Sequence, residues 1–316
     1  MPVPVTPDNF IRAESDLYFG NVVADGGFGA LYHTRELSPL DNQLVIRQNR
    51  DTIYSAGVFD LDAGPLTLTV PDAGARFLAV QVITEDHYVP EVIYRAGDHT
   101  FTREKIGTRY VLLAVRTLVD PDDPVDLAAA HALQDAMVTR QDGGPGGFEI
   151  PDWDRHSQKQ VRDALIALFA TLSDSKGMFG AEGEVDPVRR LIGAAAAWGG
   201  NPERDALYLP VTPQGNDGTT VHRLTVRDVP VDGFWSITVY DADGYFTPND
   251  RQAYSVNSIT AVPDADGAVT VRFGDCGGGA PNCLPVTPGW NYLVRLYRPR
   301  AEILDGTWKF PVAQPA

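Results

Sequence analysis

A run of alternating residues near the C-terminus constrains the fold of this chain more than any other feature. In residues 232–245, DGFWSITVYDADGY, one face carries Trp235, Ile237 and Val239, and the other carries Phe234, Ser236, Thr238 and Tyr240. A period of two is typical of a β-strand, and the Asp-Ala-Asp-Gly that follows is a hairpin-type turn. Residues 290–297 form a second long strand pattern. The C-terminal part of the chain is therefore predicted to be an all-β domain.

Short strand patterns also recur through most of the remaining sequence. Turn-forming residues separate them, as at 63–65, 71–74 and 96–98. Strands are expected at 44–48, 52–59, 66–70, 77–83, 91–94, 110–116, 206–211, 221–226, 234–240, 252–256, 268–273 and 291–297. Strands of this length and spacing are typical of β-sandwiches and small barrels.

Helical patterns occupy the N-terminus and the middle of the chain. The first helix is expected to start at Thr6-Pro7-Asp8, where a hydroxyl, a proline and an acid favour a helix start, and to end near Val23. Three more are expected at 124–138, 155–172 and 187–198. We therefore predict a mainly β (α+β) protein with two antiparallel β-sandwich domains, namely a helix plus sandwich at 1–120, a helical connector at 121–204 and a second sandwich at 205–316.

Charge and hydropathy restrict the partners of the chain. Its 316 residues carry a formal net charge of −16. Nucleic acids and anionic membranes select basic faces, so neither is expected as a partner. No segment approaches the roughly 20 apolar residues of a membrane span. The N-terminus lacks the basic and apolar regions of a signal peptide, so the chain is expected to be cytoplasmic by default, or periplasmic or secreted if a leader has been trimmed.

Two cysteines, Cys276 and Cys283, bracket a loop rich in glycine and proline. A thiolate zinc site would need more ligands than these, and neither a metal nor a cofactor is expected. The loop is flexible enough to bring the two sulfur atoms together. A disulfide and two reduced thiols are both open interpretations, and a disulfide would imply an oxidising compartment.

The sequence resembles bacterial proteins that pair two domains of unknown function, DUF1254 followed by DUF1214. The first domain is recognised in residues 47–55, RQNRDTIYS. The second is recognised in residues 229–240, VPVDGFWSITVY, together with Asp243-Gly-Tyr245, Pro285 and residues 296–308. The N-terminal part is abbreviated, as in the short form of the family. The resemblance implies an immunoglobulin-like first sandwich, a jelly-roll-like second sandwich and helices between them.

Polar residues interrupt a strand pattern at Asn49, Arg50 and Asp51. Strands disfavour Asn and Asp, so another interaction must compensate for their presence. In a functional interpretation, Asn49 and Arg50 bind an acidic or polar substrate, Asp51 orients Arg50, and Tyr54 offers a hydroxyl group for proton transfer. The alternative is a turn between strands that is held by an internal Arg–Asp pair.

Residues 85–91, EDHYVPE, form the densest group of titratable side chains. If the segment is extended, His87 and Glu91 lie on one face. His87 would then act as a general base, and a carboxylate would set its tautomer. The alternative is a solvated loop in which His87 packs against Tyr88. Two ligands are too few for a metal site.

Two further places are candidates for a ligand site. Trp198 and Asn201 lie at the junction of the helical segment and the second β domain, where pockets often form, although Trp198 could simply pack the helix against the sheet. Tyr245 and Asn249, on the loop after the hairpin-type turn, are expected to line a cleft.

These features lead to two functional hypotheses. The first is a small-molecule enzyme with hydrolase- or lyase-type acid–base chemistry, acting on a small polar or acidic substrate in a cleft between the domains. The sequence has no Gly-x-Ser-x-Gly nucleophile motif and no phosphate-binding glycine loop. The alternative is a non-catalytic protein that binds a small ligand or a partner. A homo-oligomer is compatible with both hypotheses.

Overall fold

The computed structural model describes residues 1–41, 43 and 46–316, which divide into two compact units that are discontinuous in sequence. Unit 1 comprises Met1–Arg35, Tyr54–Thr117 and Ala128–Pro202. Unit 2 comprises Glu36–Ile53, Leu118–Leu127 and Glu203–Ala316. The boundaries of the three segments expected at 1–120, 121–204 and 205–316 differ from those of the two units. One reason is that Glu36–Ile53 groups with the C-terminal strands.

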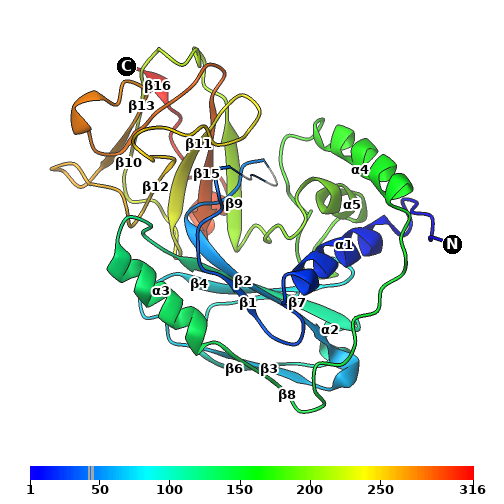
Figure 1. The fold of residues 1–316 in the computed structure, drawn as a ribbon. Coiled ribbons are helices and arrows are strands. Elements are labelled where there is room, and N and C mark those ends of the chain that lie inside the picture. The colour runs from blue at the N-terminus through cyan, green and yellow to red at the C-terminus, as the bar shows by residue number, and fades with distance from the viewer. Residues whose placement is uncertain (42, 44–45) are drawn as a thin grey trace. The chain divides into compact units, whose positions relative to one another are not determined.

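Unit 1 is built on two sheets with apolar side chains between them. One sheet has the strand order β1-β2-β7-β4-β5 and the other has the order β6-β3-β8 (Figure 1). Alternate residues of β3, such as Leu66 and Leu68, are buried in one core cluster with Val80 and Leu113 of the larger sheet. The strands are β1 (Tyr32–Thr34), β2 (Thr52–Asp60), β3 (Leu66–Val70), β4 (Leu78–Thr84), β5 (Glu91–Ile93), β6 (Gly97–Phe101), β7 (Tyr110–Leu118) and β8 (Val138–Gln141).

Three helices of unit 1 pack against one another, as Figure 1 shows: α1 (Phe10–Ala24), α4 (Arg155–Phe169) and α5 (Pro187–Ala196). Phe19 of α1 is buried with Val58 and Ile83, which places α1 on the second face of the larger sheet. Asp154 and Asp186 cap α4 and α5 by accepting backbone N–H bonds. The first helix begins later than expected, because the Asn9 side chain accepts from the Thr6 amide and holds residues 6–9 in a turn.

Unit 2 is a second sandwich. Its sheets have the strand orders β12-β11-β15-β9 and β14-β13-β10-β16. Trp235, Ile237 and Val239 of β11 are buried with Leu224 and Val271 of the opposite sheet, so the predicted alternation is confirmed. The strands are β9 (Ala206–Val211), β10 (His222–Val226), β11 (Trp235–Tyr240), β12 (Ser255–Asn257), β13 (Val269–Phe273), β14 (Cys283–Leu284), β15 (Asn291–Tyr297) and β16 (Gln314–Pro315).

The protein is thus mainly β, with antiparallel sheets and added helices, as predicted. The remaining helical elements are α2 (Arg103–Ile106), α3 (Pro124–Ala136), α6 (Ala301–Leu304), η1 (Leu61–Ala63) and η2 (Gly277–Gly279). The strand expected at 44–48 lies partly outside the described residues, and Ile46 and Arg47 form a turn. Within the described part of the chain, no helix is long and apolar enough to cross a membrane.

Candidate functional site

The face of the β11 sheet opposite the apolar core of unit 2 is polar and almost completely buried. Antiparallel pairing places Ser236 between Asn257 of β12 and Arg295 of β15, and directly opposed residues share a face. Thr238 and Ser255 are opposed in the same way. Buried polar groups require partners, so this face needs another polar segment to cover it.

That cover comes from Asp51, whose carboxylate is fully buried. Its Oδ1 accepts hydrogen bonds from the Ser255 hydroxyl at 2.7 Å and from the Asn257 amide at 3.1 Å. Its Oδ2 lies 4.0 Å from Nη1 of Arg295, a side chain that is 2% exposed. We call Asp51, Ser236, Tyr240, Ser255, Asn257 and Arg295 the Asp51 network.

Arg295 is held in its charged form. Its guanidinium donates to the Thr238 hydroxyl at 2.7 Å, to the Tyr240 hydroxyl at 2.7 Å and to the Gln48 carbonyl at 3.1 Å. Burial alone would lower its pKa, but the Tyr240 hydroxyl and the Asp51 carboxylate outweigh burial and raise the pKa above its usual value. Burial raises the pKa of Tyr240, which therefore stays protonated and donates to the Gln48 carbonyl at 2.7 Å.

The Asp51 network is not fully satisfied. Asp51 Oδ2 and Ser236 Oγ are buried and have no hydrogen-bond partner among the described residues. Both atoms belong to one cluster, because Ser236 is flanked in the sheet by Asn257 and Arg295, and both of these side chains approach Asp51. A buried carboxylate oxygen without a donor is costly to a folded protein and needs an explanation.

The side chains of Asn49 and Arg50, which were predicted to bind a substrate, instead contact other groups of the protein. The Asn49 side chain accepts from the Asp51 amide at 2.9 Å and donates to the Tyr297 hydroxyl at 3.3 Å, so it braces the backbone of Asp51. The Arg50 guanidinium donates to the Ser38 carbonyl and lies 5.8 Å and 5.5 Å from the ring centres of Phe246 and Tyr254. Asp51 is tied to Arg295 and not to Arg50, so the internal pair expected within this turn does not form.

His87 lies in unit 1 and is 1% exposed, so the solvated-loop alternative is wrong. Its ring stacks on Trp198 at 5.3 Å, and Nε2 accepts the Gly199 N–H at 2.9 Å. Nδ1 therefore carries the proton of the neutral ring, and it has no partner among the described residues. Burial, aided by the Arg190 charge, lowers the pKa of His87 to about 3, so its base strength at neutral pH is small.

The other predicted residues of unit 1 do not gather around His87. His87 has a positive φ of 60°, which breaks the extended conformation expected to align it with Glu91, and Glu91 pairs with Lys105 at 2.7 Å. The Tyr54 ring lies beneath the Arg116 guanidinium at 5.7 Å. Trp198 stacks on Tyr18 of α1 at 4.4 Å, which matches the packing interpretation of this residue. Asn201 is buried.

Unit 2 contains a separate pocket of about 190 Å³ beside the loop that follows β11. Asn249 lines it, as expected, whereas Tyr245 is not among the lining residues and its amide donates to Asp241 at 2.9 Å.

Arg295, Ser255 and Asn257 were not predicted as site residues. An arginine inside the apolar strand 291–297, opposite a serine, was the available signal. Within the described ranges, no three His, Cys, Asp or Glu side chains form a group that could hold a metal ion.

The two sandwiches, with helices packed on the first, define a class of two-sandwich α+β proteins. Residues 28–86 match the profile described as protein of unknown function DUF1254, and residues 212–301 match protein of unknown function DUF1214. The two matches confirm the resemblance to proteins that pair these two domains in this order. No curated protein matches it.

Solved structures share the fold. The VPA0106 protein of Vibrio parahaemolyticus has a TM-score of 0.74 at 16% identity, with 97% of this chain and 96% of that chain covered. An uncharacterized protein from Burkholderia cenocepacia has a TM-score of 0.53 at 13% identity, with 98% and 86% covered. At these identities the likeness concerns the fold alone.

Proposed function

We propose that this protein is an enzyme that acts on a small polar molecule in the Asp51 network, with Asp51 as the proton acceptor. The observation that carries the proposal is the buried Oδ2 of Asp51, which has no donor among the described residues and lies 4.0 Å from Nη1 of Arg295. A carboxylate that is held through one oxygen, and whose buried second oxygen lacks a donor, can accept a proton from a molecule that reaches it.

The neighbours of Asp51 supply the other roles. Arg295 keeps its charge when buried and can stabilise negative charge that develops on the substrate after proton removal. The unpartnered Ser236 hydroxyl can hydrogen-bond a substrate oxygen. Asn49 holds the Asp51 backbone, and therefore acts as a positioning residue. This set fits proton abstraction or water activation, the lyase- and hydrolase-type reactions that the sequence suggested.

His87 has no part in this proposal. Its pKa of about 3 and its hydrogen bond from Gly199 support a structural role in unit 1. Arg50 is likewise engaged with Ser38 and two aromatic rings. Asp51 therefore replaces His87 and Tyr54 as the residue to which we assign proton transfer.

The test begins with a thermal-shift screen against small hydroxy acids, esters and amides, because a ligand of the folded state raises its melting temperature. Hits are then assayed for turnover with the wild type and with Asp51→Asn. We expect Asp51→Asn to lower kcat by roughly 10² to 10⁴, the range for loss of a general base. Asp60→Asn is the matched control, since Asp60 is also buried and paired with an arginine but lies in unit 1.

Two results would contradict the proposal. Turnover of a hit by folded Asp51→Asn at the wild-type rate would remove Asp51 from the chemistry. Hits that bind the wild type at the Asp51 network and are never converted would favour the alternative, a non-catalytic ligand-binding protein. Loss of activity in Asp60→Asn as well would point to general instability, which a circular-dichroism melt identifies.

A further inference from the structure

Cys276 and Cys283 form a disulfide, and the pocket of about 190 Å³ in unit 2 is formed by two stretches of chain near it. One wall comes from the loop after β11 and includes Thr247, Asn249 and Tyr254. The other wall is Pro285–Thr287. This volume lies below the range of about 300–1,000 Å³ that is usual for drug-sized ligands, so the pocket suits a small guest.

The lining indicates the chemistry of a guest. The residues with apolar side chains that line it include Val239, Pro248, Ala253, Pro285 and Val286. Asp241 uses Oδ1 to accept the amides of Asp243 and Tyr245, both at 2.9 Å. Its Oδ2 and the Thr247 and Thr287 hydroxyls form no hydrogen bond within the described residues. One anionic oxygen and two hydroxyl groups together favour a small cation that also carries a hydroxyl group.

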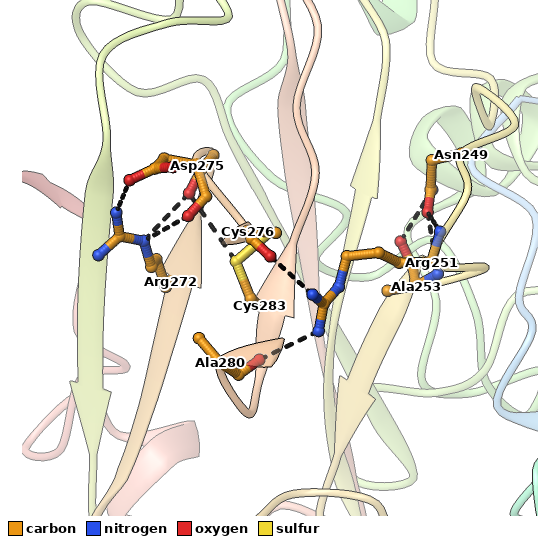
Figure 2. Close-up of a disulfide and its surroundings, with 9 residues drawn as sticks. Asn249, Arg251, Ala253, Arg272, Asp275, Cys276, Ala280 and Cys283 are labelled. Carbon is orange, nitrogen blue, oxygen red and sulfur yellow. Dashed lines mark hydrogen bonds and ion pairs between the residues drawn. A yellow bond between two sulfur atoms is a disulfide. The ribbon is translucent and has the colours of Figure 1, made fainter. Parts of the chain in front are cut away.

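Arg251 connects the first wall to the disulfide, as Figure 2 shows. Its guanidinium donates to the Cys276 carbonyl at 2.6 Å and to the Ala280 carbonyl at 3.2 Å, both within the loop that the disulfide closes. The Arg251 backbone amide donates to Asn249 Oδ1 at 3.2 Å, and the Ala253 amide donates to the same oxygen at 3.2 Å. The side chain of Arg251 thus holds the disulfide loop while its backbone is held by the pocket wall.

The second wall is connected to the disulfide through the chain itself. Cys283 is the first residue of β14, and Pro285 follows this strand directly. β14 pairs in parallel with β13 through Cys283 and Leu284, which fixes the position where the wall begins. The disulfide is therefore linked to both walls of the pocket, to one through Arg251 and to the other through the short backbone of β14.

We propose that this pocket binds a small hydroxyl-bearing amine, and that the Cys276–Cys283 disulfide holds the pocket in its binding shape through Arg251. The inference does not use Asp51, although Tyr240 both lines the pocket and belongs to the Asp51 network. Reduction by a dithiol breaks the S–S bond, leaves two cysteine thiols and converts the dithiol to its cyclic disulfide. The reduced loop has more conformations, so the Cys276 and Ala280 carbonyls no longer stay in place for Arg251.

Ethanolamine and glycolate are matched probes, since both are small and carry a hydroxyl group but they have opposite charges. Binding is measured by titration of backbone amide chemical shifts at Thr247 and Thr287 under oxidising conditions. We expect saturable shifts with ethanolamine and at least tenfold weaker binding of glycolate. Equal binding of both probes, or no saturable shift with ethanolamine, would overturn the assigned ligand class.

The role of the disulfide is tested with dithiothreitol, with the double variant Cys276→Ser and Cys283→Ser, and with Arg251→Ala. Each should weaken ethanolamine binding at least tenfold and speed hydrogen exchange at Arg251 and Ala253. Arg227→Ala is the control, because Arg227 holds the carbonyl and carboxylate of Asp266 in another loop of unit 2. If ethanolamine binding and hydrogen exchange are unchanged after reduction, the disulfide does not hold the pocket in its binding shape. Asp51→Asn should bind ethanolamine as the wild type does, so the two proposals fail separately.

Discussion

Two buried aspartates, one in each unit, are paired with arginine in different ways. In unit 1, Asp60 accepts from Arg109 Nε at 3.1 Å and from Arg109 Nη2 at 2.9 Å. It also accepts the backbone amides of Asp62 at 3.0 Å and Gly147 at 3.2 Å, so both oxygens are satisfied. In unit 2, Asp51 has donors on one oxygen only, and its arginine is 4.0 Å away.

The electrostatics support different roles for the two pairs. Burial would raise the pKa of Asp60, but the hydrogen bonds from Arg109, Gly147 and Asp62 outweigh it and lower the pKa overall. Such a bidentate pair stabilises the fold. In the Asp51 network the arginine is hydrogen-bonded but one oxygen of the buried carboxylate has no donor among the described residues, and such an unsatisfied group calls for an explanation, of which a functional role is one. The two buried aspartates therefore differ in whether both carboxylate oxygens accept hydrogen bonds, and we use this difference to distinguish a structural ion pair from a candidate site.

Among the changes considered for these two pairs, loss of Arg295, the buried arginine, should lower the free energy of unfolding the most. Arg295→Leu should lower the free energy of unfolding by about 3–5 kcal/mol, because Asp51 is then buried without a counter-ion. Arg109→Leu should cost about 1–3 kcal/mol, because the Arg109 side chain is 33% exposed and Asp60 keeps two backbone donors. Urea unfolding measures both, and a larger loss for Arg109→Leu would contradict the contrast drawn between the two pairs.

A smaller difference is expected between the two aspartates. Asp60→Asn should lower the free energy of unfolding by about 3 kcal/mol, since it disrupts a satisfied ion pair. Asp51→Asn should cost only about 1 kcal/mol, because the amide oxygen can still accept from Ser255 and Asn257 and only the long contact with Arg295 is weakened. Equal losses in guanidinium unfolding would show that the Asp51 network is as structural as the Asp60 pair.

An effect of similar size is the pH dependence expected from His87, which unit 1 buries in the neutral form. Its folded pKa of about 3 lies below the unfolded value near 6.5, so the unfolded state binds more protons between these pH values. The His87 contribution is therefore complete above pH 6.5 and is lost as the pH falls towards 3. We expect a loss of about 2 kcal/mol between about pH 7 and pH 5.

His87→Asn is the variant for this measurement, because Asn tolerates the left-handed backbone conformation of residue 87 and does not titrate. Its free energy of unfolding should change less over the same pH range than that of the wild type. Parallel pH profiles of the two proteins, followed by fluorescence in urea, would show that His87 is not held neutral by the fold.

Part of the candidate site could be predicted from the sequence. Asn49 and Asp51 stand out because polar residues in a strand pattern need compensating interactions. Their partners do not stand out, since Asp51 and Ser255 are 204 positions apart and no local pattern reports such a contact. His87 is recognisable as unusual, but its burial depends on Trp198 and Phe179, which come from other parts of the chain.

The amino-acid sequence alone is sufficient to place the longer strands and the four longer helices, because alternation, caps and turn residues act over a few positions. The strands β1, β6, β8, β14 and β16 were not predicted from it. It is also sufficient to show that β11 has one apolar and one polar face. The burial of the polar face, its cover by Asp51 and the role of Arg295 as counter-ion become evident only when the chain is folded. The physical reason is that periodicity sets the direction of a side chain within its own strand, whereas burial and pairing depend on which distant segment packs against that strand.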